Sequence, residues 1–213
     1  MSVSLLKNKS LAFLGFGELA NQFINLLEMP SNEVTIYDDN LAGTRKSAFS
    51  FSEYKDHIQK HQWLIALGYK HLSMKLQLVN DIQLNGGKLL SFVHPTSFVS
   101  KSADVKPGVF IYPMCNLDKG VHIEEGSLLN NSVVVSHDSV IGKANYISPG
   151  VIISGHVIIG DACFIGSGAI ISNGVEIGNN VVIAAGSVIT KNIPSGSFVI
   201  GNPMVFKSNI ELR

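Results

Sequence analysis

The second half of the chain repeats with a period of six residues. From Val99 to Pro194 the sequence divides into sixteen consecutive hexads without an insertion, and every hexad begins with valine, isoleucine or leucine. The fifth residue is small or β-branched in every hexad but one, where Asn145 stands instead. A repeat this regular requires a fold in which all units occupy equivalent places, so it predicts a solenoid.

The hexad length indicates which solenoid this is. Each hexad can form one short strand and one corner, so three consecutive hexads would complete one coil. The leading apolar residue would point inward and stack on its equivalents in neighbouring coils, about 4.8 Å away. Glycine and asparagine near the corners suit left-handed backbone angles. We therefore predict a left-handed parallel β-helix of hexapeptide repeats, whose flat faces favour a homotrimer.

The first part of the chain follows a different pattern, in which apolar segments alternate with segments of helical spacing. Strands are expected over 10–14, 34–37, 63–67 and 88–93, and helices over 19–29 and 72–84. This alternation predicts a small Rossmann-like α/β unit with a parallel sheet and right-handed crossovers. Because the composition changes near residue 95, the predicted domains are 1–94 and 95–213, the second ending in a short tail after hexads 99–194.

A glycine-rich turn lies between the first predicted strand and the first predicted helix. The turn runs from Gly15 to Ala20, and Asp38 follows the motif by about twenty residues, as in dinucleotide-binding proteins. A unit this short provides only one mononucleotide-binding half, which disfavours a dehydrogenase cofactor. A helix N-terminus still attracts phosphate, and carboxylates accept hydrogen bonds from a ribose or a base, so a nucleotide-linked ligand is favoured over a purely structural turn. The candidate residues are Gly15, Gly17, Glu18, Asp38, Asp39, Gly68 and Tyr69.

Charge and composition disfavour several classes of protein. Sixteen basic and sixteen acidic residues give a formal net charge of zero, so no nucleic-acid partner is expected. The two cysteines, Cys115 and Cys163, argue against a disulfide scaffold and suit a reducing compartment. No apolar run is long enough for a membrane span, and the N-terminus lacks signal-peptide features. We expect a soluble cytoplasmic protein without a membrane partner.

Two histidine patterns bear on metal binding. His57 and His61 lie four residues apart on an expected helix, which is a metal-ligand spacing, but a solvent-exposed helix face is the favoured interpretation. His122, His137 and His156 lie in the repeat region, and no two of them are separated by a whole number of coils. We therefore predict no metal.

His137 and Asp138 fall at a predicted corner of the β-helix. One coil later, Gly155 would stack on His137 and His156 on Asp138. A neutral imidazole can take a proton from a nucleophile while the Gly155 N–H receives a developing oxyanion, and Asp138 can hold one tautomer and raise the basicity of the ring. This arrangement suits acyl transfer, although an ordinary polar corner histidine is equally compatible with the spacing.

From residue 11 to about residue 205, the chain resembles the bacterial hexapeptide-repeat sugar acyltransferases that carry an N-terminal Rossmann-like subdomain. These include the nucleotide-amino-sugar N-acetyltransferases of bacillosamine and perosamine synthesis and the sialic acid O-acetyltransferase relatives. The matching segments are Gly15–Ala20, Tyr37–Asp39, Ala66–Gly68, His94–Pro95, Ser136–Asp138 and Gly201–Pro203. Two positions depart from the family pattern, because the family usually has a histidine in the glycine turn and often a second histidine where Tyr146 stands.

The resemblance implies that His137 is the general base, that Asp138 tunes it, and that the acetyl group lies near Gly155. It implies that acetyl-CoA binds in the groove between neighbouring rods, near Tyr146, Ser167 and Ala185. The expected reaction is acetyl transfer from acetyl-CoA to the amine of a nucleotide-linked deoxyamino sugar, in surface-polysaccharide, O-antigen or glycan synthesis. O-acetylation of a sugar or of sialic acid, and a non-catalytic β-helix scaffold, are the alternatives. The identity of the nucleotide stays open.

Overall fold

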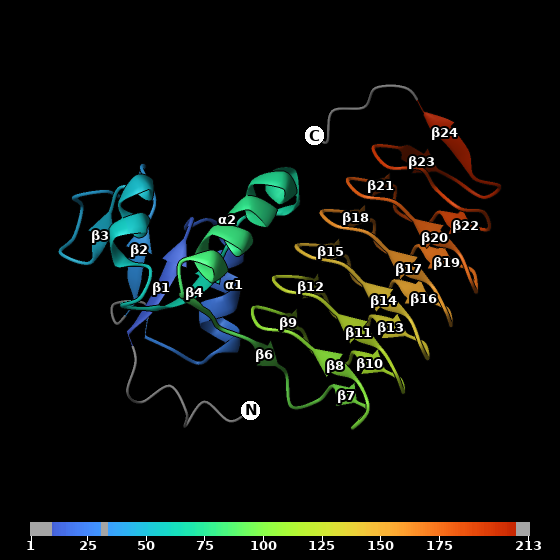
Figure 1. Ribbon diagram of the computed structural model, residues 1–213, viewed down its shortest axis with the longest axis horizontal. Coiled ribbons are helices and arrows are strands. Elements are labelled where there is room, and N and C mark those ends of the chain that lie inside the picture. The colour runs from blue at the N-terminus through green and yellow to red at the C-terminus, as the bar shows by residue number, and fades with distance from the viewer. Residues whose placement is uncertain (1–9, 31–33, 208–213) are drawn as a thin grey trace.

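Three parallel sheets run along the repeat region and form the sides of a β-solenoid (Figure 1). The structure is a computed structural model that describes residues 10–30 and 34–207. One side of the solenoid carries the α/β unit, and we call it the docked face. Its strands are β6 (Phe92–Val93), β9 (Phe110–Ile111), β12 (Leu128–Leu129), β15 (Tyr146–Ile147), β18 (Phe164–Ile165), β21 (Val182–Ile183), β23 (Phe198–Ile200) and the antiparallel β24 (Val205–Lys207).

The other two sides of the solenoid carry no α/β unit, and we name them by their strand number. The six-strand face contains β7 (Phe98–Val99), β10 (Asn116–Leu117), β13 (Val134–Val135), β16 (Ile152–Ile153), β19 (Ile170–Ile171) and β22 (Val188–Ile189). The five-strand face contains β8 (Asp104–Val105), β11 (His122–Ile123), β14 (Val140–Ile141), β17 (Ile158–Ile159) and β20 (Glu176–Ile177).

From β6 to β22 the coils stack in the predicted register, with strands paired three hexads apart; the last coil is two residues shorter, since β21 pairs with β23 at a separation of sixteen residues. Leu117 pairs with Val135, and Val135 pairs with Ile153, in parallel orientation. All three side chains are fully buried in one continuous core. The predicted parallel β-helix of hexapeptide repeats is therefore confirmed.

The solenoid begins earlier than the first predicted hexad. The N–H of Phe92 donates to the carbonyl of Val109 at 3.0 Å, and β6 pairs with β9 as part of the docked face. Pairing thus starts just before the predicted end of the first domain at residue 94. Residues 93–98 in fact form one more hexad in the same register, with Val93 first and Ser97 fifth, so the repeat could have been counted from Val93.

The corners share one backbone feature. The fourth residue has a positive φ in every hexad from Gly108 to Gly186, and half of these residues are not glycine. Asp138 (φ 57°) and His156 (φ 55°) are two of the non-glycine residues in this left-handed conformation. Such a conformation is uncommon for residues other than glycine, asparagine and aspartate. The left-handed conformation at each corner is therefore determined by the position of the residue in the coil more than by its type.

The α/β unit is built on a parallel sheet of strand order β3-β2-β1-β4-β5. Its elements are β1 (Leu11–Leu14), α1 (Glu18–Leu26), β2 (Thr35–Tyr37), β3 (Ala48–Phe49), η3 (Phe51–His57), β4 (Gln62–Ile65), η4 (Tyr69–His71), α2 (Leu72–Leu84) and β5 (Lys88–Leu89). This order confirms the Rossmann-like unit. Of the described α-helices, neither α1 nor α2 has the length and apolar content needed to cross a membrane.

Two details of the sheet differ from the sequence expectation. The strand expected over 88–93 is split, because its first part pairs with β4 whereas Phe92 and Val93 pair with the solenoid. Strand β3 was not expected, since it is very short and pairs only with the end of β2. Both differences arise from pairing with segments that are distant in the sequence.

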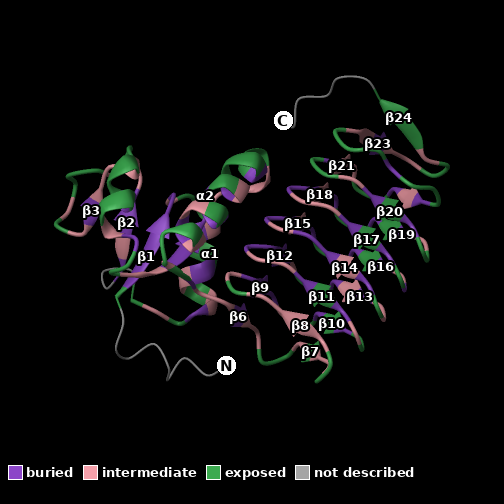
Figure 2. Ribbon diagram, in the orientation of Figure 1, coloured by how far each residue is buried: buried purple, intermediate pink, exposed green. Residues whose placement is uncertain are grey.

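The α/β unit packs closely on the docked face (Figure 2). A Cβ atom on Gly126 would lie 2.5 Å from Cγ2 of Val79, so α2 meets bare solenoid backbone there. Phe23 of α1 packs on Phe110 with ring centroids 4.1 Å apart. Lys75 of α2 is buried at this interface, and it has no hydrogen bond or ion pair with another described residue.

Candidate active site

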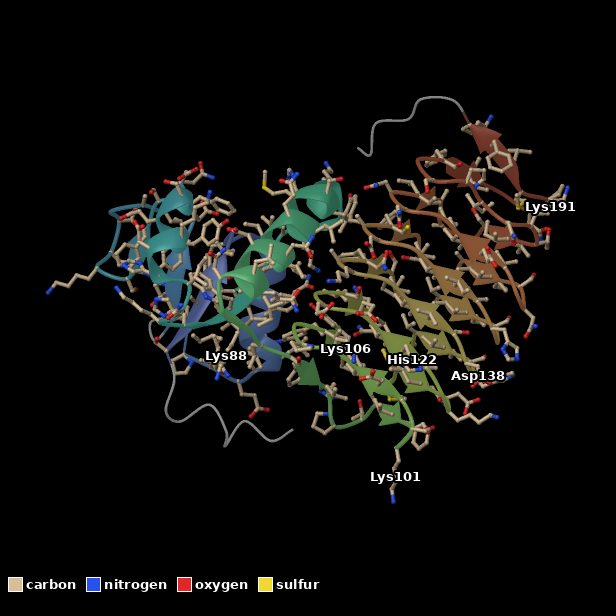
Figure 3. All side chains as sticks on the ribbon, in the orientation of Figure 1. Lys88, Lys101, Lys106, His122, Asp138 and Lys191 are labelled. Atoms are coloured by element: carbon tan, nitrogen blue, oxygen red, sulfur yellow. The ribbon has the colours of Figure 1, made fainter. Side chains whose placement is uncertain are left out.

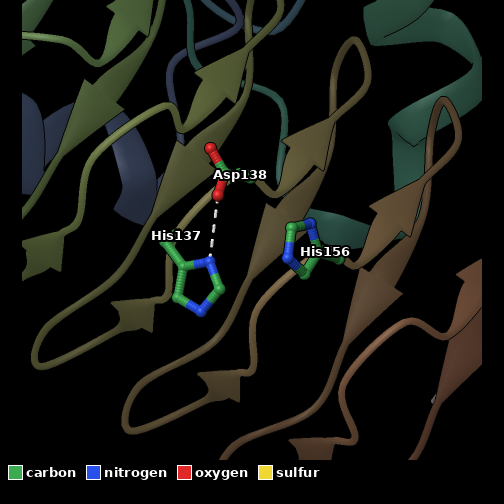
Figure 4. A group of neighbouring side chains, drawn as sticks. All are labelled: His137, Asp138 and His156. Carbon is green, nitrogen blue, oxygen red and sulfur yellow. Dashed lines mark hydrogen bonds and ion pairs between the residues drawn. The ribbon is translucent and has the colours of Figure 1, made fainter.

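His137 and Asp138 occupy the corner between β13 and β14, where the six-strand and five-strand faces meet. Nδ1 of His137 lies 3.0 Å from Oδ2 of Asp138 (Figure 4). Neighbouring residues on an extended strand point to opposite faces, and the left-handed backbone of Asp138 is what brings its carboxylate to the ring. The hydrogen bond to His137 is the main cause that lowers the pKa of the Asp138 carboxyl. The carboxylate therefore favours the tautomer that carries its proton on Nδ1 and leaves Nε2 free as an acceptor.

Gly155 lies directly against the imidazole of His137. A Cβ atom at this position would lie 2.7 Å from both Nε2 and Cε1 of the ring. Only glycine leaves this space to the histidine. Among the described residues, none accepts a hydrogen bond from the Gly155 N–H. Nε2 of His137 and an available backbone donor are thus neighbours on one corner.

Two further polar residues at this corner belong to neighbouring coils. The His156 ring lies 4.9 Å from the His137 ring, centroid to centroid, at an interplanar angle of 86°. Oδ1 of Asn173 would be 2.9 Å from a Cβ on Gly155. Asn173 was not expected at this site, although it lies one coil beyond Gly155 and therefore stacks on it as Gly155 stacks on His137. His137, Asp138 and His156 form the one group of metal-ligand type among the described residues.

The glycine-rich turn and the acidic pair meet at the edge of the α/β sheet. The Asp38 carboxylate accepts hydrogen bonds from the N–H groups of Phe16 and Asn40, each at 2.9 Å. Asp39 accepts one from the N–H of Phe51 at 2.8 Å. Both carboxylates thus order local backbone, and each retains lone pairs for a ligand. Asp39 is exposed, whereas Asp38 is half-buried.

The other predicted nucleotide-site residues at this sheet edge lie where strands end and helices begin. Gly15 is buried with φ 79°, and a Cβ there would lie 2.9 Å from the Leu67 side chain. Gly17 precedes α1, and the exposed Glu18 is the first residue of that helix. Gly68 precedes η4. Gly15 and Gly68 follow the adjacent strands β1 and β4, so both lie at the carboxyl-terminal edge of the sheet.

Tyr69 and Tyr146 lie together at the contact between the α/β unit and the docked face. The Tyr69 ring packs on Tyr146 at 5.9 Å and on Phe164 at 4.8 Å, measured between centroids. Burial raises the pKa of the Tyr146 hydroxyl. Ser167 and Ala185 stand elsewhere, on the corner between the docked face and the six-strand face. Within one chain, the predicted residues thus fall in four places: the His137 corner, the corner of Ser167 and Ala185, the sheet edge, and the contact of Tyr69 with Tyr146.

His57 and His61 do not form the solvent-exposed face that the sequence suggested. Both side chains converge on the Tyr37 hydroxyl, with Nδ1 of His57 at 2.7 Å and Nε2 of His61 at 3.2 Å. Burial, together with the charge of Glu53, raises the pKa of Tyr37 to about 12. Burial is also the main cause that lowers the pKa of His61. The η3 segment folds back over β2, which helical spacing alone does not reveal.

The repeat region matches two family models. The bacterial transferase hexapeptide model (six repeats) matches residues 138–173, and the hexapeptide repeat of succinyl-transferase matches residues 156–191.

Several solved structures match the chain over nearly its whole length. The acetyltransferase domain of PglB from Neisseria gonorrhoeae is 25% identical with a TM-score of 0.80, and the match covers 94% of this chain and 100% of that chain. PerB from Caulobacter crescentus, solved in complex with CoA and GDP-perosamine, is 24% identical with a TM-score of 0.81 and coverages of 94% and 98%. WeeI from Acinetobacter baumannii is 22% identical with a TM-score of 0.77 and coverages of 94% and 100%. The last two matches establish similarity of fold.

The chain thus has the fold of the hexapeptide-repeat acyltransferases that carry an N-terminal Rossmann-like subdomain, and together with the match to the transferase hexapeptide model this supports an acyltransferase. Within that class, the structures that it resembles include a perosamine N-acetyltransferase.

Proposed function

We propose that the protein transfers an acetyl group from acetyl-CoA to the amino group of a nucleotide-linked deoxyamino sugar. The observation that carries this proposal is the His137 ring, held by Asp138 through Nδ1 and packed with Nε2 against Gly155. Similarity to PglB, solved with acetyl coenzyme A, and to PerB, solved with CoA and GDP-perosamine, supports the choice of donor and acceptor.

The proposed reaction is a direct transfer with His137 as general base. The neutral sugar amine attacks the thioester carbonyl, and Nε2 of His137 takes the amine proton as the tetrahedral intermediate forms. The N–H of Gly155 donates to the oxyanion. The intermediate then collapses with loss of the CoA thiolate, which takes up the proton held by His137. Asp138 stabilises the transient imidazolium, as a carboxylate beside Nδ1 does in other acyl-transfer sites.

The α/β unit supplies the proposed nucleotide site. Its sheet edge offers the backbone N–H groups at the start of α1, next to Gly17, for a pyrophosphate. The exposed carboxylate of Asp39 is available to a base N–H or a ribose hydroxyl. This edge and the His137 corner are separate within one chain, so we further propose that a homotrimer brings them together and that acetyl-CoA lies between subunits near Ser167 and Ala185.

Apolar side chains on the uncovered faces support the trimer. Ile152 and Ile170 on the six-strand face are 41% and 38% exposed, and Ile158 on the five-strand face is 47% exposed. Exposed apolar patches of this kind mark interaction surfaces. Light scattering should give the mass of three chains, and a monomer with full activity would contradict the assembly.

The proposal includes a cytoplasmic location and a role in surface-polysaccharide or glycan synthesis. The two cysteines, Cys115 and Cys163, are buried and unpaired, which suits a reducing compartment.

The deciding experiment measures CoA release with a panel of UDP-, dTDP- and GDP-linked amino sugars and with sugars that offer only hydroxyl groups. One nucleotide-linked amine should be the preferred acceptor. His137→Asn should lower kcat by about 10²–10⁴ and leave CoA affinity almost unchanged, because the variant loses the base and not the donor site. His156→Asn is the matched control with a modest effect. Near-normal turnover of His137→Asn would remove the base assignment, and acetylation of hydroxyl acceptors alone would replace N-transfer by O-transfer.

A further inference from the structure

The corner around His137 holds three side chains of the types that bind transition metals. The imidazoles of His137 and His156 and the carboxylate of Asp138 each offer one donor atom, and these atoms lie within 4.8 Å of one another. Tetrahedral zinc with ligands at about 2.0–2.1 Å brings its donors to within about 3.4 Å. Nδ1 of His137 and Oδ2 of Asp138 are already 3.0 Å apart, so only His156 must move closer.

His156 has the freedom to make this movement. Its side chain is exposed, whereas its backbone is fixed by a hydrogen bond from its own N–H to the carbonyl of His137 at 3.0 Å. The movement that zinc requires is therefore one of the exposed side chain, with the backbone of the corner kept in place. Figure 4 shows the three side chains gathered on one side of the corner.

The charges around the group favour a cation on balance. The exposed Asp138 carboxylate carries a negative charge at neutral pH, as aspartates ordinarily do, and unprotonated imidazoles are neutral ligands. Lys119 is the nearby lysine whose positive charge acts on Asp138. It opposes a dication, but it is exposed to solvent, where screening weakens the repulsion.

We propose that His137, Asp138 and His156 form a binding site for a divalent transition metal such as Zn²⁺, and that the metal switches off His137 as a base. A neutral imidazole carries one proton. When the metal takes the Nδ1 lone pair, that proton resides on Nε2, the nitrogen that faces Gly155. A protonated Nε2 cannot accept a proton from an amine. The inhibitory half of this inference rests on the proposed function, whereas the binding half does not.

Zinc binding tests the site without any substrate. Wild-type protein competes with a chromophoric chelator for Zn²⁺, and we expect one competing ion per chain. His156→Asn should weaken this binding by at least about tenfold, since even residues that only support metal ligands contribute tenfold or more. Asparagine tolerates the left-handed backbone of position 156, so this variant keeps the corner intact. His122→Asn is the control with unchanged zinc affinity, because His122 lies on β11 of the five-strand face, where its Nδ1 is 3.6 Å from Oδ2 of Asp104. Figure 3 labels His122 and Asp138 at their separate positions on the solenoid.

Measurement of acetyl transfer in the presence of zinc then tests whether the metal inhibits the enzyme. Zinc should abolish wild-type acetyl transfer over the concentration range in which it binds, and a chelator should restore it. His156→Asn should keep most of its turnover and require at least about ten times more zinc for inhibition. Equal zinc affinity in wild type and His156→Asn would overturn the site. Tight binding with undiminished turnover would overturn the inhibition alone, and binding without any acetyl transfer would leave the site standing while the proposed function falls.

Discussion

The solenoid is stabilised by contacts that repeat from coil to coil, whereas the α/β unit is stabilised by contacts that each occur once. In the solenoid, the place of a residue in its hexad fixes its environment, so Val135 and Ile153 have the same burial and equivalent partners one coil apart. In the α/β unit, each contact occurs once, as when Trp63 Nε1 donates to the carbonyl of Ile58 at 2.8 Å. Because the solenoid is held by its repeated core, residues at its corners can be substituted with little loss of stability, and the candidate base stands at such a corner. In the α/β unit, where each contact occurs once, few residues can be substituted without loss of stability.

After the loss of His137 itself, the largest expected effect concerns Gly155, the glycine that leaves space for the proposed base. Gly155→Ala would place a methyl group 2.7 Å from Nε2 of His137, so the ring must move away from the reacting atoms. We expect kcat to fall by about 100-fold with little change in CoA affinity or melting temperature, because displacements of about 1 Å in a site have effects of this size. Steady-state kinetics of Gly155→Ala beside Ser154→Ala, which adds no atom to the same corner, measures the effect. Equal turnover in the two variants would show that the glycine is not needed.

The next effect separates the functions of the two halves. Asp39→Ala should raise KM for the nucleotide sugar about ten- to a hundredfold, which corresponds to the loss of one charge-assisted hydrogen bond, and should leave KM for acetyl-CoA unchanged. Asp38→Ala should do the same and lower the melting temperature more than Asp39→Ala, because Asp38 holds the N–H groups of Phe16 and Asn40 whereas Asp39 holds only that of Phe51. Kinetics with each substrate varied in turn checks both variants. If both KM values rose together, the α/β unit would have only a structural role.

The smallest effect is on stability, at the interface between the halves. Burial lowers the pKa of Lys75 from 10.5 to about 8. The unfolded chain therefore binds this proton more tightly than the folded one, so stability rises with pH between about 8 and 10.5 and is reduced by a constant amount below 8. Lys75→Met removes the buried charge and should raise the free energy of unfolding at pH 7 by about 1–3 kcal/mol.

Urea denaturation across this pH range distinguishes the outcomes for Lys75. Wild type should gain stability above pH 8, whereas Lys75→Met should show no such gain from this position. A Lys75→Met variant that is less stable than wild type at neutral pH would mean that the ammonium group has a partner at the interface.

Much of the solenoid could be predicted because its sequence repeats every six residues and its structure every three hexads. The inward position, the strand register and the stacking of Gly155 on His137 all follow from counting hexads and coils. The left-handed residue was harder to locate, since it is the fourth of each hexad whether or not it is glycine, as Asp138 and His156 show. The backbone path of the coil, and not the conformational preference of the residue, decides which residue adopts the left-handed conformation.

The parts that could not be predicted depend on contacts between distant segments. Helical spacing of His57 and His61 does not show that both reach the Tyr37 hydroxyl, because Tyr37 belongs to a strand much earlier in the chain. The packing of Tyr69 on Tyr146 likewise depends on how the α/β unit docks. Resemblance to a family supplied Tyr146, Ser167 and Ala185 as candidates near acetyl-CoA, and their roles remain predictions.

The coil of three hexads also governs which insertions and deletions this chain can tolerate. Adding or removing one whole coil beyond those that carry the α/β unit changes only the length of the rod, because every later corner keeps its direction. Adding a single hexad just before His137 would turn the rest of the rod by one third of a coil. His137 would then stand on a different edge, and Tyr146 and Phe164 would leave the Tyr69 ring that they now contact, although the strands could still pair and fill the core. Natural variants of this architecture should therefore differ in length by whole coils before this corner, and a shortened version made for engineering must follow the same rule to keep its chemistry.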